Sequence, residues 1–362
     1  MKPQEKMMKS SMARLAFGAS CVGLAGMAQA QSSVTMYGIV DAGVEYVNHA
    51  SSDGGAARLV SGGKNTSRWG LRGVEDLGGG LKAVFQLESG INVANGSLDD
   101  GPGALFDRRA TVGLKNRFGQ LTLGRTFTVT YDYMLQFDPM GYAPNYSWAT
   151  SSNATGGRKD GLFSRSANAV RYDGTFAGFK LGALYGFGNV PGSMKTSSKY
   201  DFAVGYGNGP FAAVVTFDRQ NGASDSVTPA DTTNYIQGIH AGLSYDFGAA
   251  KAMAGYRNYR RTFTNASPTL LSDMYWIGGS YDFTPYFTLY GAVYHQNIKG
   301  GSDADPTLFS LRGQYALSKR TVLYLSGGYA MAKHDSKVSL SRDLTGAADT
   351  QAGVTAGIQH RF

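Results

Sequence analysis

The segment Gly238-Ile-His-Ala-Gly-Leu-Ser-Tyr-Asp-Phe247 places apolar and polar side chains in strict alternation. Ile239 and Leu243 fall on one face of an extended chain, whereas His240 and Ser244 fall on the other. Because side chains alternate between the two faces of a strand, this pattern predicts a β-strand with one apolar and one polar face. The same period recurs through residues 34–362 in segments of about nine to fourteen residues, and none of them has convincing helical spacing.

The composition excludes several classes of protein. The chain has 362 residues with 50 Gly, 22 Tyr and 19 Phe, and only 17% of its residues are charged. Ordinary soluble α/β enzymes have about 25% charged residues, and a helical membrane protein needs runs of about 18 apolar residues. The hydrophobic content of 42% is too high for a disordered chain. A turn-rich, all-β chain remains.

The N-terminus has the pattern of a secretory signal peptide. Four basic residues precede the apolar stretch 15–27, and Ala28-Gln29-Ala30 forms a small-x-small cleavage site. We therefore expect a signal peptide at residues 1–30 and a single barrel domain at 31–362. Cleavage removes the single Cys, Cys21, so the mature chain has no disulfide. Loss of four basic residues and one acidic residue lowers the net charge from +8 to +5.

The connections between the predicted strands alternate between short and long. Short turns are predicted at 75–80, 116–119, 174–178, 207–209, 247–250, 283–285 and 317–320. Long loops are predicted at 48–66, 92–104, 127–164, 188–198, 220–234, 262–271, 298–307 and 334–352. A soluble sandwich would also alternate apolar and polar faces, but its strands average about five or six residues. Three features favour a transmembrane barrel instead: the long strands, the alternation of short turns with long loops, and the aromatic residues at strand ends. Such aromatic residues occur in Ser244-Tyr-Asp-Phe247 and Ser280-Tyr-Asp-Phe283.

Eight long loops and seven short turns predict sixteen antiparallel strands. The first and last strands then meet, which closes the barrel and leaves no unpaired backbone edge in the membrane. A barrel of about eight strands is filled by its own side chains, whereas sixteen strands enclose a water-filled lumen. The architecture therefore predicts a channel.

Several segments resemble the general porins of β-proteobacteria. Residues 32–43 resemble their first strand, residues 68–88 their second hairpin and residues 117–125 the strand before their third loop. Residues 357–362 are similar to their C-terminal strand, which ends in Phe. The resemblance implies a homotrimer of sixteen-stranded barrels in the Gram-negative outer membrane, in contact with its lipid and lipopolysaccharide. It also implies that Phe362 belongs to a signal read by the barrel-assembly machinery, and Phe362 fits an aromatic girdle as well.

In the family that this chain resembles, the third loop folds into the lumen and narrows it. Residues 127–164 correspond to that loop and are too many for a plain connector. Asp132 and Asp138 are the acidic candidates for the constriction. Phe137-Asp-Pro-Met-Gly141 stands where the family has an acidic, Gly-paired loop tip, so the sequence departs from the family here.

The resemblance places a basic ladder on the wall opposite the loop. Its positions correspond to Arg68, Arg108 and Arg165, and the further candidates are Arg72, Arg109, Arg125 and Arg171. Strand parity directs Arg68, Arg72, Arg165 and Arg171 inward, because their neighbours Trp69, Leu71, Val170 and Tyr172 form the apolar face. Parity does not decide between Arg108 and Arg109. Alternatively, these arginines form structural pairs with Glu75, Asp107 or Asp173, or lie at the lipopolysaccharide boundary.

The predicted function is passive diffusion of small hydrophilic solutes and ions, with a mild preference for anions, since arginine rings attract anions. A substrate-specific channel, with Tyr286, Tyr290 and Tyr294 as an aromatic track, and an adhesin-like barrel are the alternatives. The five His residues lack catalytic or metal-ligand spacing. We therefore expect that the protein is not an enzyme and binds no metal or cofactor. His240 is expected to face the lumen. The basic residues are dispersed along the chain, which argues against nucleic acid as a partner.

Overall fold

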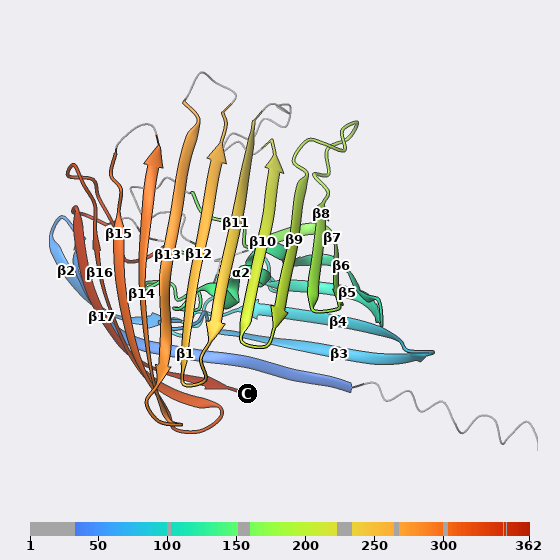
Figure 1. Cartoon of the computed structure of the whole chain (residues 1–362), viewed down its shortest axis with the longest axis horizontal. Coiled ribbons are helices and arrows are strands. Elements are labelled where there is room, and N and C mark those ends of the chain that lie inside the picture. Colours follow the sequence, from blue (N-terminus) through green and yellow to red (C-terminus); the bar gives the residue numbers. More distant parts are fainter. Residues whose placement is uncertain are drawn as a thin grey trace, which may run out of the picture.

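The computed structural model describes residues 33–99, 103–150, 160–222, 234–263, 268–299, 303–342, 344 and 346–362. The predicted signal peptide at 1–30 lies outside these residues. Within them the chain forms one antiparallel sheet that curls round on itself (Figure 1). No helix of the described residues is long and apolar enough to cross a membrane.

The wall consists of seventeen labelled strands. Their bounds are β1 (Ser33–Ser51), β2 (Gly54–Ser61), β3 (Arg68–Gly78), β4 (Leu81–Gly90), β5 (Arg109–Asn116), β6 (Gly119–Phe127), β7 (Arg165–Phe176), β8 (Phe179–Gly186), β9 (Lys199–Asn208), β10 (Phe211–Asn221), β11 (Tyr235–Asp246), β12 (Ala250–Arg261), β13 (Leu270–Asp282), β14 (Phe287–Lys299), β15 (Thr307–Ala316), β16 (Thr321–Met331) and β17 (Thr350–Arg361). The long loop between β6 and β7 contains the short helix α2 (Val129–Met134) and the 3-10 turn η1 (Leu135–Phe137).

These seventeen segments occupy sixteen positions in the wall, as predicted. β2 pairs with the second half of β1, and β3 pairs with its first half, so β2 and β3 together form one interrupted strand. The prediction of a loop over 48–66 is wrong for most of its length. The reason is that β1 continues to Ser51 and gains a partner there, which satisfies backbone groups that a loop would leave to water.

The barrel is closed by the first and last strands. β1 pairs with β17 from Ile39 opposite Arg361 to Val47 opposite Gly353. The backbone of Phe362 also exchanges two hydrogen bonds with Gly38, of 3.1 and 3.2 Å. Among the described strands the sheet therefore has no open edge, which is the condition for a strand-built wall in hydrocarbon.

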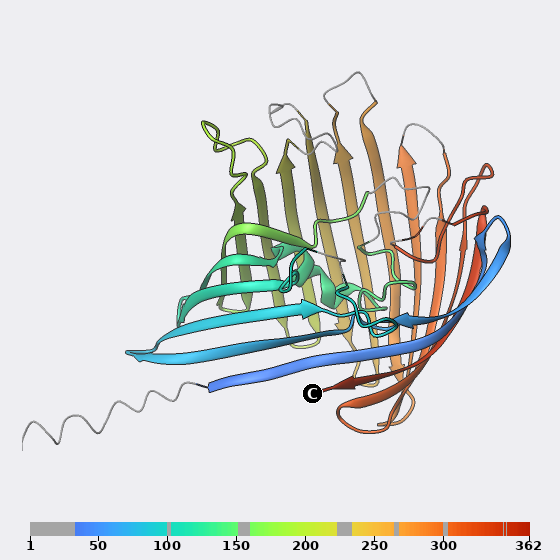
Figure 2. The ribbon, with the colours of Figure 1, turned by 180° about the vertical axis from the view of Figure 1, so that it is seen from behind.

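The outer and inner faces follow the predicted parity. On β11, Ile239 and Leu243 are 44% and 53% exposed, whereas His240 on the other face is 1% exposed. The exposed apolar side chains form the outer surface, and His240 faces inward, 3.2 Å from the carboxylate of Asp218. The buried apolar core accordingly lies inside the barrel, where the long loop packs against the wall (Figure 2).

Candidate functional site

The loop between β6 and β7, here called loop 3, crosses the inside of the barrel. It leaves β6 at Phe127, and α2 lies against the inner face of β9 and β10. Thr128 caps this helix by accepting a hydrogen bond of 3.1 Å from the Tyr131 backbone. Thr130 donates hydrogen bonds from its backbone and its hydroxyl to the carboxylate of Asp201 on β9. The sequence did not predict this helix, because β-branched residues at its start disfavour it and the wall holds it instead.

The tip of loop 3 is organised around Asp138. Its carboxylate accepts hydrogen bonds from the backbone of Met140 and Tyr142, from the hydroxyl of Ser147 and from the hydroxyl of Tyr294 on β14. Asp138 is 4% exposed, and this burial raises the pKa of its carboxyl above the ordinary value. Asp138 was predicted to line the constriction, but the structure encloses its carboxylate in the loop, where it holds the shape of the tip.

The far end of loop 3 contacts the strands that close the barrel. Asn145 donates to Glu45 on β1, and Tyr146 bonds to Thr355 on β17 at 2.7 Å. Trp148 donates to the carbonyl of Leu340, which belongs to the loop between β16 and β17, here called loop 8. The described part of loop 3 is thus anchored at both sides of the barrel.

Loop carbonyls also receive buried arginines from the wall. Arg257 on β12 donates to the carbonyls of Trp148 and Ala149, and Arg312 on β15 donates to that of Met140. The sequence did not identify either residue, because alternation shows only that a side chain faces inward. Which group an inward side chain contacts inside the barrel depends on the path of loop 3.

Phe127, the last residue of β6, forms the centre of an arginine cluster. The guanidinium carbons of Arg108, Arg109 and Arg165 lie 5.2, 4.6 and 5.3 Å from the centre of its ring. A ring face attracts cations, and carboxylates that pair with these arginines, those of Glu88, Asp132 and Asp107, offset the repulsion between them. The sequence alone does not single out Phe127, since an aromatic ring at the end of a strand also suits a girdle.

One group of charges surrounds Glu88 on β4. Its carboxylate lies 2.8 Å from Nε of Arg108 and 3.9 Å from Nε of Arg68, and it accepts a 2.8 Å hydrogen bond from the Tyr37 hydroxyl. Arg72 lies on the same inner face with its guanidinium 5.3 Å from the Tyr37 ring. Glu88 was not among the predicted site residues, although it shares the inward parity of Gln86, which pairs with Arg72.

A second group surrounds Asp132 on α2. Nη2 of Arg109 lies 3.2 Å from its carboxylate, and Nη1 of Arg171 lies 2.7 Å from it. Arg171 also pairs with Asp173 at 2.7 Å. The structure therefore brings together Asp132, Arg109 and Arg171, three of the predicted residues, between loop 3 and the wall.

The remaining candidates lie at the edge of this arrangement. Arg165 is 3.9 Å from the carboxylate of Asp107, and Nε of Arg125 donates to the Asp107 carbonyl. Arg125 shares its parity with Leu123, which is exposed on the outer face, and it lines neither of the cavities described below. Of the structural partners considered for these arginines, Asp107 and Asp173 are present in the pairs, whereas Glu75 is exposed on β3.

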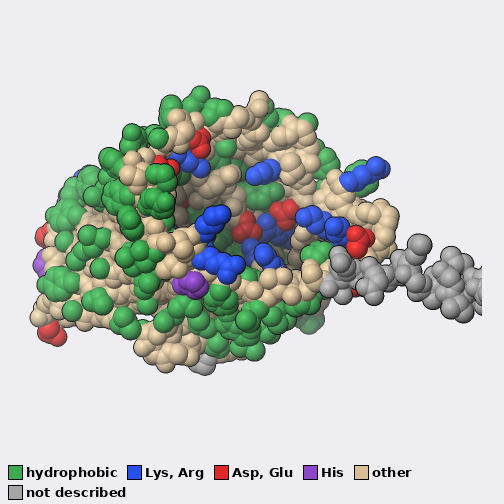
Figure 3. Space-filling view, turned by 90° about the horizontal axis from the view of Figure 1, so that it is seen from below, with side chains coloured by type: hydrophobic (Ala, Val, Ile, Leu, Met, Phe, Trp, Pro, Cys, Tyr) green, Lys and Arg blue, Asp and Glu red, His purple; other side chains and the backbone are tan. Residues whose placement is uncertain are grey.

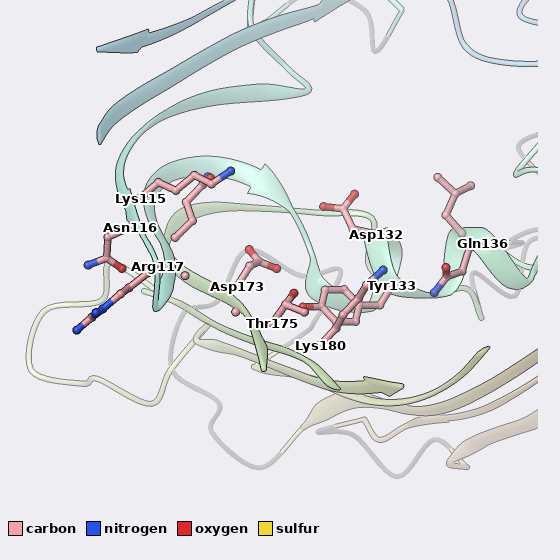
Figure 4. Close-up of a pocket in the computed structure, with 13 residues that line it drawn as sticks. Lys115, Asn116, Arg117, Asp132, Tyr133, Gln136, Asp173, Thr175 and Lys180 are labelled. Carbon is pink, nitrogen blue, oxygen red and sulfur yellow. The ribbon is translucent and has the colours of Figure 1, made fainter. Parts of the chain in front are cut away.

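Two cavities adjoin the charged groups on the short-turn side of loop 3. One has a volume of about 740 Å³ and is lined by Arg72, Lys82, Arg109, Lys115 and Arg171 among others. The other, of about 550 Å³, lies beneath α2, where Asp132, Tyr133, Asp173 and Lys180 contribute to its lining (Figure 4). Seen from the short-turn end, basic side chains gather in a hollow that opens into the barrel (Figure 3).

The proposed aromatic track is not continuous. Tyr294 is buried and bonded to Asp138, Tyr290 lies 4.9 Å from the guanidinium of Arg312, and Tyr286 is 62% exposed in the turn before β14. Tyr290 and Tyr294 therefore support the loop and its arginine contact. The described residues contain no group of three or more His, Cys, Asp or Glu side chains that could hold a metal ion.

A closed antiparallel barrel crossed by a loop and lined with charges defines a porin-type channel protein. The chain belongs to the Gram-negative porin family, whose model matches residues 16–335. It is 32% identical to an outer membrane porin protein of Bordetella pertussis, over 94% of this chain and 97% of that one. It is 33% identical to outer membrane porin protein 32 of Delftia acidovorans, over 98% of this chain and all of that one.

Solved structures agree with this assignment. The anion-selective porin from Comamonas acidovorans matches with a TM-score of 0.77 and 29% identity, covering 92% of this chain and all of that one. OmpT of Vibrio cholerae, in a trimer form, has the same fold with a TM-score of 0.67 at 18% identity, covering 91% and 99%. The chain is an outer-membrane porin, and the bacterial outer membrane is its location.

Proposed function

We propose that this porin is a passive channel for small hydrophilic solutes and ions with a preference for anions. The observation that supports the preference is the imbalance of charge at the cavities and ion pairs beside loop 3. The basic side chains there are Arg68, Arg72, Lys82, Arg108, Arg109, Lys115, Arg117, Arg165, Arg171 and Lys180. The acidic ones are Glu88, Asp107, Asp132 and Asp173. The anion selectivity of the Comamonas relative supports the same preference.

Basic side chains predominate on the wall beside loop 3, and Asp132 of loop 3 faces them. Arg72, Lys82 and Lys115 belong to the wall, whereas Asp132 belongs to loop 3. Arginine remains charged at every working pH, and rings of basic side chains favour anions. Loop 3 narrows the passage, so that solutes pass close to these charges, and no step requires catalysis or a cofactor.

The test is the zero-current potential of the purified protein in a planar bilayer under a salt gradient. We expect the sign that corresponds to anion preference. The variant Arg72→Gln/Lys82→Gln/Lys115→Gln is expected to lower the anion-to-cation permeability ratio. Lys195→Gln/Lys319→Gln/Lys337→Gln is the matched control, because it removes three exposed cations outside the cavities. Cation preference of the wild type, or equal effects of the two variants, would reject the proposed selectivity.

We further propose a homotrimer surrounded by outer-membrane lipid and lipopolysaccharide. The trimer form of the Vibrio structure supports this assembly. The measurement is the mass of the unheated protein in mild detergent, which should equal three subunits. A monomer that conducts would reject the trimer and leave the channel function in place.

Residues 1–30 are proposed to be an export signal and Phe362 part of a signal for the barrel-assembly machinery. N-terminal sequencing of the protein from outer membranes should begin at Gln31. Phe362→Ala is expected to reduce the amount of barrel assembled in cells while refolding into detergent micelles continues. If refolding fails equally, Phe362 is needed for the contact with Gly38 and not for recognition.

A further inference from the structure

The connector between β2 and β3, residues 62–67, leaves the plane of the sheet. β2 leaves β1 at Ala42 and β3 joins it at Ile39, so the connector has six residues where β1 has two. The additional chain cannot remain in register with β1 and must bend out of the wall. Gly62 allows this bend, because its φ of +81° lies in the left-handed region that favours glycine.

The contacts of this connector show that it bends into the barrel. The Asn65 backbone donates to the carboxylate of Asp41 on the inner face of β1 at 2.9 Å. The Asn65 side chain donates to the Gly141 carbonyl at the tip of loop 3 at 3.4 Å. Gly63 approaches Tyr324 on β16 so closely that a Cβ atom would lie 2.5 Å from the tyrosine hydroxyl. The connector is therefore a second chain segment inside the lumen, beside the tip of loop 3.

Lys64 is the charged residue of this connector. It is partly exposed, and within the part of the chain that the structure describes no carboxylate lies at ion-pair distance from it. Asp41 is the nearby acid. Both oxygens of that carboxylate already accept hydrogen bonds, from the Tyr324 hydroxyl and from the nitrogens of Asn65 and Gln359. The charge of Lys64 therefore remains available to ions in the water of the lumen.

Arg312 on β15 and Arg361 on β17 add positive charge near Lys64. Arg312 is 2% exposed, and its Nη2 donates to the Met140 carbonyl at 3.1 Å. Its Nε and Nη1 have no hydrogen-bond partner among the described residues, and neither has the hydroxyl of Ser326, which lies opposite Arg312 in the strand register. Fixed donors of this kind beside a cation are what an anion needs, because hydrogen bonds to a charged group are the strong ones.

We propose that Lys64 is a further selectivity residue of this channel and forms, together with Arg312, a second site that attracts small anions such as chloride and carboxylates. The proposal rests on the channel function proposed above. It adds a basic site on a different part of the wall, since Arg109 and Arg165 of the Phe127 cluster belong to β5 and β7. It also gives the interruption between β2 and β3 a purpose, because an unbroken strand would leave no chain to carry a cation into the lumen.

The charge of this second site depends on pH near neutrality. Burial, followed by the charges of Arg312 and Arg361, lowers the pKa of Lys64 to about 7, and Asp41 opposes this change. Lys64 is therefore charged below about pH 7 and neutral above it. Of the described groups that contact the connector, Tyr324 donates to Asp41, and loop 3 contributes the uncharged Gly141 carbonyl. The anion preference of the channel should accordingly contain a part that is lost as the pH rises through about 7.

The experiment measures the zero-current potential of the full protein under a salt gradient at about pH 6 and at about pH 8.5. The anion-to-cation permeability ratio of the wild type is expected to fall by up to about fivefold between the two pH values. Lys64→Gln should have the low ratio at both pH values. Lys64→Arg should keep the high ratio at both, because arginine does not lose its proton in this range. Lys195→Gln removes an exposed cation from a long loop and should behave like the wild type.

Equal permeability ratios of the wild type and Lys64→Gln at about pH 6 overturn the proposal. A change with pH that persists in Lys64→Arg also overturns it, because another group would then be responsible. If Lys64→Gln does not assemble, the comparison of the wild type with Lys64→Arg decides by itself, since the proposal requires their pH dependence to differ. Anion preference that no Lys64 variant alters rejects this site alone, whereas cation preference of the wild type rejects the proposed selectivity of the channel together with it.

Discussion

Asp132 and Asp138 lie six residues apart on one loop, yet they serve different purposes. Asp132 is 26% exposed at its side chain and faces two arginines, whereas Asp138 is enclosed by four hydrogen-bond donors. The first therefore affects the charge seen by a passing ion, and the second affects the rigidity of the loop. The same residue type acquires its role from its surroundings.

Asp132→Asn should increase the preference for anions. The substitution removes the charge that neutralises part of Arg109 and Arg171. A unit charge about 4 Å away in water is worth about 1 kcal/mol, so the anion-to-cation permeability ratio should rise by about fivefold at most. The zero-current potential under a salt gradient measures this ratio. A fall in the ratio would contradict the assigned position of Asp132.

Asp138 should make the packing of loop 3 depend on pH. Burial raises the pKa of its carboxyl, so ionisation is less favourable in the packed loop than in a released one. The protonated Asp138 carboxyl therefore stabilises the packed loop. This contribution is complete below the ordinary Asp pKa of about 3.9 and is lost as the pH rises through the raised pKa. Current noise from the open channel should therefore be lower at acidic than at neutral pH.

Asp138→Asn should abolish this pH dependence, because Asn does not titrate. Asp132→Asn is the matched variant on the same loop and should retain it. Noise that increases toward acidic pH in the wild type would show that the carboxylate, and not the acid, is the stable form in the packed loop.

At the level of structural elements, loop 3 and loop 8 support each other. Arg342 of loop 8 donates from Nη1 to the Tyr142 carbonyl and the Thr150 hydroxyl, and its backbone donates to the Pro144 carbonyl. Val338 and Leu340 of loop 8 are fully buried in the same apolar cluster as Trp148. The inner core of this barrel is thus built from two loops and the inner wall.

Arg342→Ala should loosen loop 3 without unfolding the barrel. It removes hydrogen bonds that are worth about 0.5–1.5 kcal/mol each, which is small compared with the ladders of the wall. We expect more frequent partial closures in single-channel records and faster cleavage of loop 3 by added protease. Lys337→Ala, an exposed position on loop 8, is the control. Identical records for the two variants would show that loop 8 does not restrain loop 3.

At the scale of the whole molecule, the closed hydrogen-bonded sheet stabilises the barrel, and the charged side chains act on passing ions through the water of the lumen. Exposed charges are screened within about 10 Å at 0.1 M salt and about 3 Å at 1 M. Anion preference should accordingly decline as the salt concentration rises, whereas conductance continues to increase. The measurement is the permeability ratio at a fixed concentration gradient, from 0.05 M to 1 M. A permeability ratio that does not change with salt concentration would indicate that ions are selected by size or by binding, and not by the electrostatic field of the charged side chains.

Alternation and loop lengths alone determined the class of fold, the number of wall positions and the inward or outward direction of most side chains. They suffice because a strand has a period of two and a membrane demands a closed sheet, so few architectures satisfy both. The parity of Arg68, Arg72 and Arg171 follows from this local rule. So does the inward direction of His240, which lies beside Asp218.

Only the tertiary structure decided how the inward residues meet. The enclosure of Asp138, the arginines gathered on Phe127 and the pairing of Glu88 with Arg108 join residues far apart in the chain. Arg125 donates to the Asp107 carbonyl and lines neither cavity. Such contacts depend on the path of loop 3 across the barrel. Hydrogen bonds to strands on both sides of the barrel set that path, and no periodic pattern in the sequence encodes it.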